Sequence, residues 1–293
     1  MGQKITLLII PVRGKSNTVA VMVAVFLFKE DFVGRPLILD ISFYQDNPDT
    51  EERIVDFKKM KSSGVSGVIF RVGQATWEDK KFVEYWRNSE TSGLSRGAYW
   101  YYDNSVDPKI QARKCISILN KMNAKLEMPL FADFEDKRTS LPYHGWKKWY
   151  EFLEELGYIS DYNLGIYSNY YYWMENRPKG SESFRDKYFG SYPLWLAQYP
   201  YENHRNEDEY KNPNIPSTWN TWEFWQVSDR GNGRFHGVES SRVDVNYFNG
   251  TVEEFNSKYG INYIPPKEEP NPVKPEIHVS GQYGNKTIIY KEI

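Results

Sequence analysis

Short apolar segments recur along the chain from Arg35 onward, each bounded by polar or turn-forming residues. Segments of this length that are rich in Val, Ile, Leu, Phe, Trp and Tyr are typical of buried β-strands. The pattern predicts eight strands, over Leu37–Ser42, Gly67–Gly73, Gly97–Tyr102, Pro129–Glu135, Leu164–Ser168, Pro193–Tyr199, Glu223–Val227 and Arg242–Phe248.

Between the first five of these segments, apolar residues recur every three or four positions, which predicts amphipathic helices. The helices are expected over Glu51–Ser63, Glu78–Ser89, Asp107–Asn123 and His144–Leu156. Asp107 followed by Pro108 is a typical helix start, and Gly157 is the expected C-cap of the last helix. After the fifth strand the connecting segments are rich in Tyr and Asn and have weaker helical periodicity.

Strands that alternate with helices predict an α/β protein with a parallel sheet. Eight such strands predict closure into a TIM-like (β/α) barrel, here with reduced helices in the second half. We expect this barrel to occupy residues 35–260. Residues 261–293 are expected to form a Pro-rich linker and a short C-terminal tail, because five of the eleven residues 265–275 are proline.

Residues 1–34 are an N-terminal extension of open status. Thr18–Phe28 is an apolar run that is too short to span a membrane, so no stable membrane insertion is expected. It loosely resembles the apolar region of a signal peptide, but no small-residue cleavage site precedes the charged segment Lys29–Asp31. A β-hairpin, or an artefactual extension of the reading frame, fits these residues as well.

Composition narrows the possible functions. The chain has 23 Tyr, 16 Phe and 10 Trp among 293 residues, and such rings either stack on sugars or fill cores. The net charge of −2 argues against nucleic-acid binding. Cys115 is the single cysteine, which excludes an intramolecular disulfide, and four histidines without clustered spacing predict neither a metal site nor a cofactor. We expect a monomer.

The segment Met128–Asp136 carries the strongest chemical signal. In a strand, Asp133 and Glu135 point to the same face with Cα atoms roughly 6–7 Å apart, while Phe134 and Asp136 face away. Two carboxyl groups at such a separation are the minimal apparatus for cleaving a glycosidic bond. One of them donates a proton, and the other stabilises or attacks the sugar carbon.

Other polar residues are predicted to join this pair, because the active site of such a barrel forms at the carboxyl ends of its strands. A single aspartate near a strand end is most often a helix or loop cap. Here, however, four carboxylates from three predicted strands are expected at one rim: Asp40, Asp133, Glu135 and Asp244. The third strand offers either Tyr99 and Tyr101 or Trp100 and Tyr102. The remaining polar candidates at strand ends are Asp40, Tyr167, Gln226 and Asp244. Asp229 is a minor candidate in Asp229–Gly233, a predicted hairpin turn.

The order of these segments resembles glycoside hydrolase family 25, the N-acetylmuramidase lysozymes of bacteria and phages. The blocks that carry the resemblance cover about residues 35–258: ILDIS, GVIFRVGQ, RGAYWYY, PLFADFED, LGIYSN, LWLAQY, WEFWQVS and RVDVNYF. The resemblance implies a retaining hydrolase that cleaves the β-1,4 bond between N-acetylmuramic acid and N-acetylglucosamine in peptidoglycan glycan strands. Such an enzyme acts on the bacterial cell wall, after secretion or release at phage lysis.

The resemblance also implies residue roles. Glu135 matches the general acid, and Asp133 matches either a nucleophile or the group that orients the substrate N-acetyl oxygen. Asp40 and Asp244 match flanking carboxylates that would raise the pKa of Glu135 and hold sugar hydroxyls. The other matches, around the cleaved bond, are Tyr102, Tyr167, Trp195 and Gln226. We expect Glu135 to have an elevated pKa and Asp133 to stay ionised.

Three alternatives remain. A chitinase-like hydrolase is disfavoured, because Pro129, Leu130 and Phe131 stand where the acidic D-x-x-D-x-D-x-E run of that class would begin. A non-catalytic sugar-binding barrel usually loses its acid, whereas this chain keeps all four carboxylates. A structural component of a phage particle is compatible with the unusual ends of the chain.

Overall fold

A computed structural model describes residues 34–46, 55–137, 144–200 and 212–261, together with the backbone of two short strands. These are β1 (Ile9–Pro11) and β2 (Ala20–Met22), which pair antiparallel with each other. The rest of the N-terminal extension, including most of the apolar run Thr18–Phe28, lies outside the described residues. So do the Pro-rich linker and the tail.

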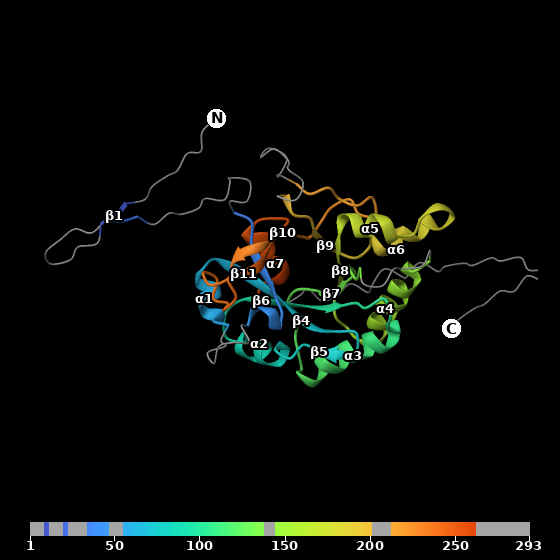
Figure 1. Ribbon diagram of the computed structural model, residues 1–293, viewed down its shortest axis with the longest axis horizontal. Coiled ribbons are helices and arrows are strands. Elements are labelled where there is room, and N and C mark those ends of the chain that lie inside the picture. The colour runs from blue at the N-terminus through green and yellow to red at the C-terminus, as the bar shows by residue number, and fades with distance from the viewer. Residues whose placement is uncertain are drawn as a thin grey trace, which may run out of the picture.

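The core of the protein is an eight-stranded barrel (Figure 1). Hydrogen bonding runs in the order β3-β11-β10-β9-β8-β7-β6-β4, and β3 pairs with β4 to close the ring. The barrel strands are β3 (Leu37–Ile41), β4 (Val65–Gln74), β6 (Ser95–Tyr101), β7 (Leu130–Asp133), β8 (Leu164–Asn169), β9 (Leu194–Ala197), β10 (Phe224–Asn232) and β11 (Arg242–Phe248). The predicted TIM-like barrel is confirmed.

One strand departs from the predicted parallel sheet. β11 runs antiparallel to both of its neighbours, β10 and β3, so the barrel is mixed. The reason is the connection before it. The β10–β11 link is a hairpin with no helix, and a hairpin joins antiparallel strands whereas parallel strands need a longer crossover.

The hairpin itself lies further along the chain than predicted. Asp229–Asn232 continue β10 and pair with β11 up to Asn232↔Arg242, so the connection begins at Gly233. The expected turn at Asp229–Gly233 is therefore wrong. Its Asn-Gly pair ends the strand instead, and two register irregularities let the long β10 follow its partner.

Helices cover the outside of the strands (Figure 1). They are α1 (Phe57–Ser62), α2 (Phe82–Asn88), α3 (Pro108–Lys121), α4 (Trp146–Ile159), α5 (Tyr170–Asn176), α6 (Asp186–Phe189) and α7 (Val252–Tyr259), with short 3-10 segments η2 (Phe43–Gln45) and η3 (Gly180–Arg185). Asp107 caps α3 as expected, with its side chain accepting from Lys109 N and Ile110 N. Gly157 is not a C-cap, because α4 continues to Ile159 and is capped at Ser160.

Apolar side chains form two layers separated by the sheet. The larger layer lies between the strands and the helices. The smaller fills the barrel and includes Ile38, Ile69, Phe131 and Trp195. Gly165 makes room in this interior, because a Cβ there would lie 2.5 Å from the ring of Phe131.

Helix α7 closes the amino-terminal end of the barrel. Its Phe255 and Tyr259 belong to the interior layer and contact Phe248, the last residue of the antiparallel β11. Tyr259 also packs on Phe224, the first residue of β10. Because this end is plugged by aromatic side chains, the polar rim at the carboxyl ends of the parallel strands is left as the end where a substrate can enter.

Candidate active site

Four carboxyl groups meet at the polar rim. Asp40 is near the carboxyl end of β3, Asp133 is the last residue of β7, and Glu135 follows two residues later. Asp244 is near the start of β11 and is the register partner of Asp40. Only the antiparallel direction of β11 brings the beginning of that strand to the rim where the other strands end.

Asp40 and Asp244 form a hydrogen-bonded carboxyl pair. Such a bond needs one proton between the two groups. Burial and the neighbouring charge of Asp40 raise the pKa of Asp244 to about 9, so Asp244 holds that proton at neutral pH. Asp40 Oδ2 also accepts from Gln226 Nε2 at 2.9 Å and from Asn246 Nδ2 at 2.8 Å.

A chain of hydrogen bonds joins this pair to Glu135. Gln226, which donates to Asp40, accepts at Oε1 from the hydroxyls of Tyr167 (3.0 Å) and Tyr199 (2.7 Å). Tyr167 is also hydrogen bonded to the carboxyl of Glu135. The protonation state of Asp40 therefore affects the pKa of Glu135 in two ways, through this chain of hydrogen bonds and through the charge of Asp40.

Glu135 has the environment of a general acid. Burial raises its pKa to about 7, and the charges of Asp40 and Asp136 act in the same direction. The hydrogen bond between Tyr167 and Glu135 and the charge of Lys137 oppose this rise. The elevated pKa expected for Glu135 therefore has burial as its main cause, with the neighbouring carboxylates second.

Asp133 departs from the expectation that it stays ionised. Burial, followed by the charges of Glu135 and Asp40, raises its pKa well above the ordinary value for an aspartate. Its side chain is only 3% exposed, and Oδ1 has no hydrogen-bond partner among the described residues. The positive charge of Arg71 is the main influence that favours its ionised form. The surroundings therefore raise the pKa of both members of the central pair.

The loop after β7 keeps the alternation predicted for a strand, although the strand itself ends at Asp133. Phe134 points outward and stacks on Trp149 of α4, with ring centroids 4.8 Å apart. Asp136 also faces outward: its carboxylate accepts from Asn104 N at 3.1 Å, and its carbonyl accepts from Asn104 Nδ2 and from the hydroxyl of Tyr172. Glu135 is thus held between two anchored neighbours.

Two predicted substrate-binding residues do not lie on the open rim. Tyr102 packs against Phe134 and Phe152 of α4, in the layer outside the barrel. The side chain that shares the rim's parity is Tyr101, which pairs in register with Asp133. Trp195 is 1% exposed inside the barrel, where its indole donates to Asn246 Oδ1 at 2.7 Å. Trp195 therefore holds Asn246 in place from inside the barrel and does not face a ligand.

The structure adds three polar residues to the predicted set, Arg71, Tyr199 and Asn246, and it selects Tyr99 from the two pairs that the third strand offered. Each stands an even number of residues from an interior-facing position of its own strand or strand end, such as Ile69 for Arg71 and Asp244 for Asn246. Side-chain parity along the strands was the signal that could have found them. The minor candidate Asp229 lies in the extension of β10, where Arg230 contacts it at 3.5 Å.

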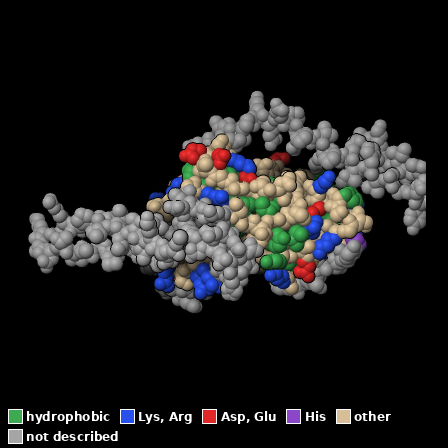
Figure 2. Space-filling view, turned by 90° about the horizontal axis from the view of Figure 1, so that it is seen from above, with side chains coloured by type: hydrophobic (Ala, Val, Ile, Leu, Met, Phe, Trp, Pro, Cys, Tyr) green, Lys and Arg blue, Asp and Glu red, His purple; other side chains and the backbone are tan. Residues whose placement is uncertain are grey.

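In the described ranges, no three His, Cys, Asp or Glu side chains are arranged to hold a metal ion. None of the helices described for this chain is long and apolar enough to cross a membrane. Basic and acidic side chains both appear on the face shown in Figure 2, among apolar and uncharged ones, in keeping with the net charge of −2.

Comparison with known proteins identifies the family. The model of "Glycosyl hydrolases family 25" matches residues 39–238. YegX of Escherichia coli strain K12 is 29% identical over 220 residues, which cover 74% of this chain and 70% of YegX. Lysozyme M1 of Streptomyces globisporus is 25% identical, over 73% of this chain and 68% of its own. A bacterial lysozyme structure from Streptomyces coelicolor superposes with a TM-score of 0.60 at 21% identity, over 77% of this chain and 97% of the lysozyme. The chain therefore belongs to family 25 of the glycosyl hydrolases, and it is a glycoside hydrolase.

Proposed function

We propose that this protein is a muramidase that cleaves the β-1,4 bond between N-acetylmuramic acid and N-acetylglucosamine in peptidoglycan. The observation that carries the proposal is the rim of four carboxyl groups, in which Asp40 and Asp133 are buried and Glu135 has a pKa of about 7. Membership of family 25 means that the reaction is the hydrolysis of a glycosidic bond. The similarity to Lysozyme M1 favours a substrate in the cell wall. Its place of action would be the bacterial cell wall.

In the proposed reaction, Glu135 donates its proton to the glycosidic oxygen as the bond to the sugar carbon breaks. A general acid has to be protonated yet able to release its proton, and a pKa near 7 satisfies both needs at neutral pH. After the first step the carboxylate of Glu135 accepts a proton from the attacking water.

Asp133 is proposed as the second group, either attacking the anomeric carbon or orienting the substrate N-acetyl group for that attack. Attack on the anomeric carbon needs the ionised carboxylate of Asp133, and orientation of the N-acetyl group needs a carboxylate oxygen that accepts a hydrogen bond. The positive charge of the nearby Arg71 favours this ionised form. Both routes retain the anomeric configuration. Proton NMR of a fresh digest is expected to show the β-anomer first, and the α-anomer as first product would contradict this assignment.

The decisive experiment compares the wild type with Glu135→Gln on a suspension of purified bacterial cell walls. Glutamine keeps the shape and cannot donate the proton, so we expect the rate of clearing to fall by about 10²–10⁴-fold. Equal clearing by both proteins would remove Glu135 from the role of acid. Binding to walls without clearing by either protein would favour the non-catalytic sugar-binding barrel.

The products identify the bond. Chromatography of the digest should give fragments that end in reducing N-acetylmuramic acid. Reducing N-acetylglucosamine ends would instead indicate a glucosaminidase or a chitinase-like specificity. Glu151→Gln serves as a matched acidic-to-amide control, because Glu151 is exposed on α4 and is not proposed to touch the substrate.

A further inference from the structure

A cluster of aromatic rings surrounds a buried arginine at one side of the rim. The 3-10 segment after β3 supplies Phe43 and Tyr44, and the short strand β5 (Trp77–Glu78) after β4 supplies Trp77. The guanidinium carbon of Arg71 lies 4.9 Å from the ring centroid of Phe43 and 5.3 Å from those of Tyr44 and Trp77. We call these four residues the Arg71 platform.

The platform exposes large apolar rings to solvent. Tyr44 is 67% exposed and Trp77 is 40% exposed, although both sit on short, well-anchored segments. Tyr158, another exposed aromatic residue, lies near the end of α4 that leads into β8, away from the rim. Exposed rings that flank a polar group are a common feature of sites that bind small molecules.

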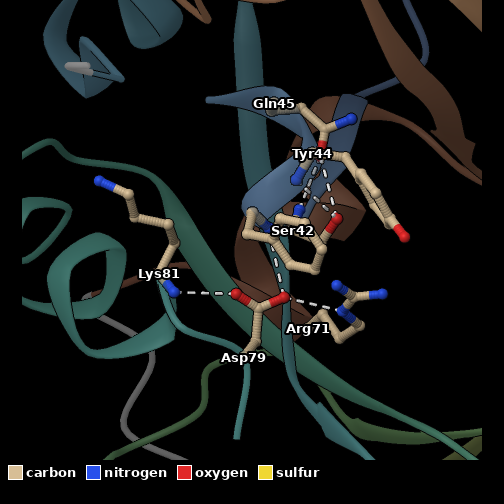
Figure 3. A network of polar contacts seen from close by, with 7 residues as sticks. Ser42, Tyr44, Gln45, Arg71, Asp79 and Lys81 are labelled. Carbon is tan, nitrogen blue, oxygen red and sulfur yellow. Dashed lines mark hydrogen bonds and ion pairs between the residues drawn. The ribbon is translucent and has the colours of Figure 1, made fainter. Parts of the chain in front are cut away.

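A polar network fixes the platform in place (Figure 3). Asp79 is 1% exposed, and its Oδ2 accepts from Arg71 Nε at 2.7 Å and from Phe43 N at 3.2 Å. Its Oδ1 accepts from Lys81 N at 2.9 Å. A capping box between Ser42 and Gln45 holds the segment that carries Tyr44. The rings are therefore positioned before any ligand arrives.

Gly73 sets the position of Trp77. It pairs with Glu78 in the β4–β5 hairpin, and a Cβ there would lie 2.3 Å from the carbonyl oxygen of Trp77 and 2.7 Å from the ring of Trp100. Only glycine permits β5 to approach β4 this closely. The hairpin, and with it the position of Trp77, thus depends on glycine at residue 73.

Arg71 keeps an unused donor inside the platform. Its side chain is 6% exposed, and Nη2 is buried without a hydrogen-bond partner among the described residues. A buried, charged donor without an acceptor costs free energy, which the surrounding rings offset only in part. An acceptor oxygen from a ligand would complete the arrangement. The charge of Arg71 also acts on Asp133 and Tyr99, so the platform adjoins the catalytic carboxyls.

We propose that the Arg71 platform is a subsite for a sugar residue next to the cleaved bond, with Tyr44 and Trp77 against the apolar face of the pyranose and Arg71 Nη2 donating to an acyl or carboxylate oxygen on that sugar. This inference rests on the proposed function, because it takes the glycan strand as the substrate. The occupant is a sugar and not a stem peptide. An extended peptide needs a row of backbone partners, and β5 offers an edge of only two residues.

Binding to an inactive form tests the subsite without turnover. In the Glu135→Gln background, the affinity for a peptide-free tetrasaccharide of alternating N-acetylglucosamine and N-acetylmuramic acid is measured by calorimetry. We expect Trp77→Ala and Tyr44→Ala each to weaken binding by about five- to twentyfold, which is typical for the loss of one well-packed aromatic contact. Tyr158→Ala removes a more exposed ring far from the rim and should bind like its parent. Circular dichroism melts verify that each variant is folded.

The acceptor of Arg71 is identified by a second sugar. Arg71→Lys keeps the charge but loses the planar fork, and we expect it to bind the tetrasaccharide about tenfold more weakly. Chitotetraose carries N-acetyl groups but no lactyl groups. Equal losses on both sugars would assign the N-acetyl oxygen, and a loss on the muramic-acid sugar alone would assign the lactyl oxygen. No loss on either sugar would overturn the role of Arg71.

The outcomes separate this inference from the proposed function. If the wild type clears cell walls while Trp77→Ala and Tyr44→Ala bind and hydrolyse like the wild type, the subsite is wrong and the muramidase stands. If walls are not cleared but tetrasaccharide binding still depends on Trp77, the muramidase is wrong and the subsite stands. Affinity that appears only for glycans bearing stem peptides would also overturn the sugar subsite.

Discussion

The proton shared by Asp40 and Asp244 decides what each aspartate can do for Glu135. Asp244 holds the proton at neutral pH, with a pKa of about 9. Asp40 therefore carries the negative charge of the pair, and that charge raises the pKa of Glu135. Two aspartates that look equivalent in the sequence are expected to differ in their effect on the general acid.

This difference predicts a shift in the pH profile. Glu135 must be protonated to act, so kcat/KM should fall as pH rises through about 7, the pKa of Glu135. Asp244→Asn replaces a neutral group by a neutral group that still donates to Asp40, so the alkaline limb should stay in place. The double variant Asp40→Asn/Asp244→Asn removes the charge, and its limb should move down by about one pH unit.

Initial rates of wall clearing between pH 4 and 9 measure these limbs. An unmoved limb in the double variant would assign the elevated pKa to burial alone. Wall substrates carry their own charges, so the three proteins are compared at one ionic strength.

Single residues were predicted well where a polar side chain interrupts an apolar run. Asp40, Asp133, Glu135 and Asp244 stand out for that reason, and the structure brings them together. Tyr102 was misplaced because residues 99–102 are aromatic throughout, which hides the alternation of faces. Arg71 was missed because its use depends on Asp79 and Phe43, and no local pattern connects the three.

At the scale of elements, the positions of the strands could be predicted from the sequence, but the direction of one strand could not. Apolar runs located all eight barrel strands, since burial on both faces leaves a continuous signal. The direction of β11 has no such signal, because an antiparallel strand reads the same as a parallel one. The helix α7 was not predicted either, although Thr251 and Glu254 form a capping box at its start.

Helix α7 is expected to contribute strongly to stability through Phe255, which is fully buried under the barrel. Phe255→Ala removes a large side chain from a packed interior and should lower the free energy of unfolding by about 3–5 kcal/mol. Val252→Ala on the exposed side of the same helix should change it by less than about 0.5 kcal/mol. Urea unfolding followed by tryptophan fluorescence measures both. Similar small effects would show that α7 is not part of the cooperative core.

At the scale of the whole molecule, the buried carboxyls make the active site a source of instability. Burial raises the pKa of Asp40, Asp133, Glu135 and Asp244 above the values of an unfolded chain. Between the unfolded and folded pKa values the folded protein binds more protons, so stability is greatest at low pH and is lost as pH rises. For Glu135 this window runs from about 4.5 to about 7, and for Asp244 from 3.8 to about 9.

The melting temperature should therefore fall between about pH 5 and pH 9, in contrast to proteins whose carboxylates are stabilised by ion pairs. Asp244→Asn removes a group whose window extends to about pH 9 and keeps a hydrogen bond to Asp40, so it should raise the melting temperature at pH 8.5 by several degrees and much less at pH 5. Calorimetry at the two pH values measures the difference. Asp161→Asn, an exposed change in the loop before β8, should melt like the wild type at both. An equal gain for Asp244→Asn at both pH values would mean that the benefit comes from packing. A gain confined to high pH would show that the site keeps its carboxyls for chemistry at the expense of stability.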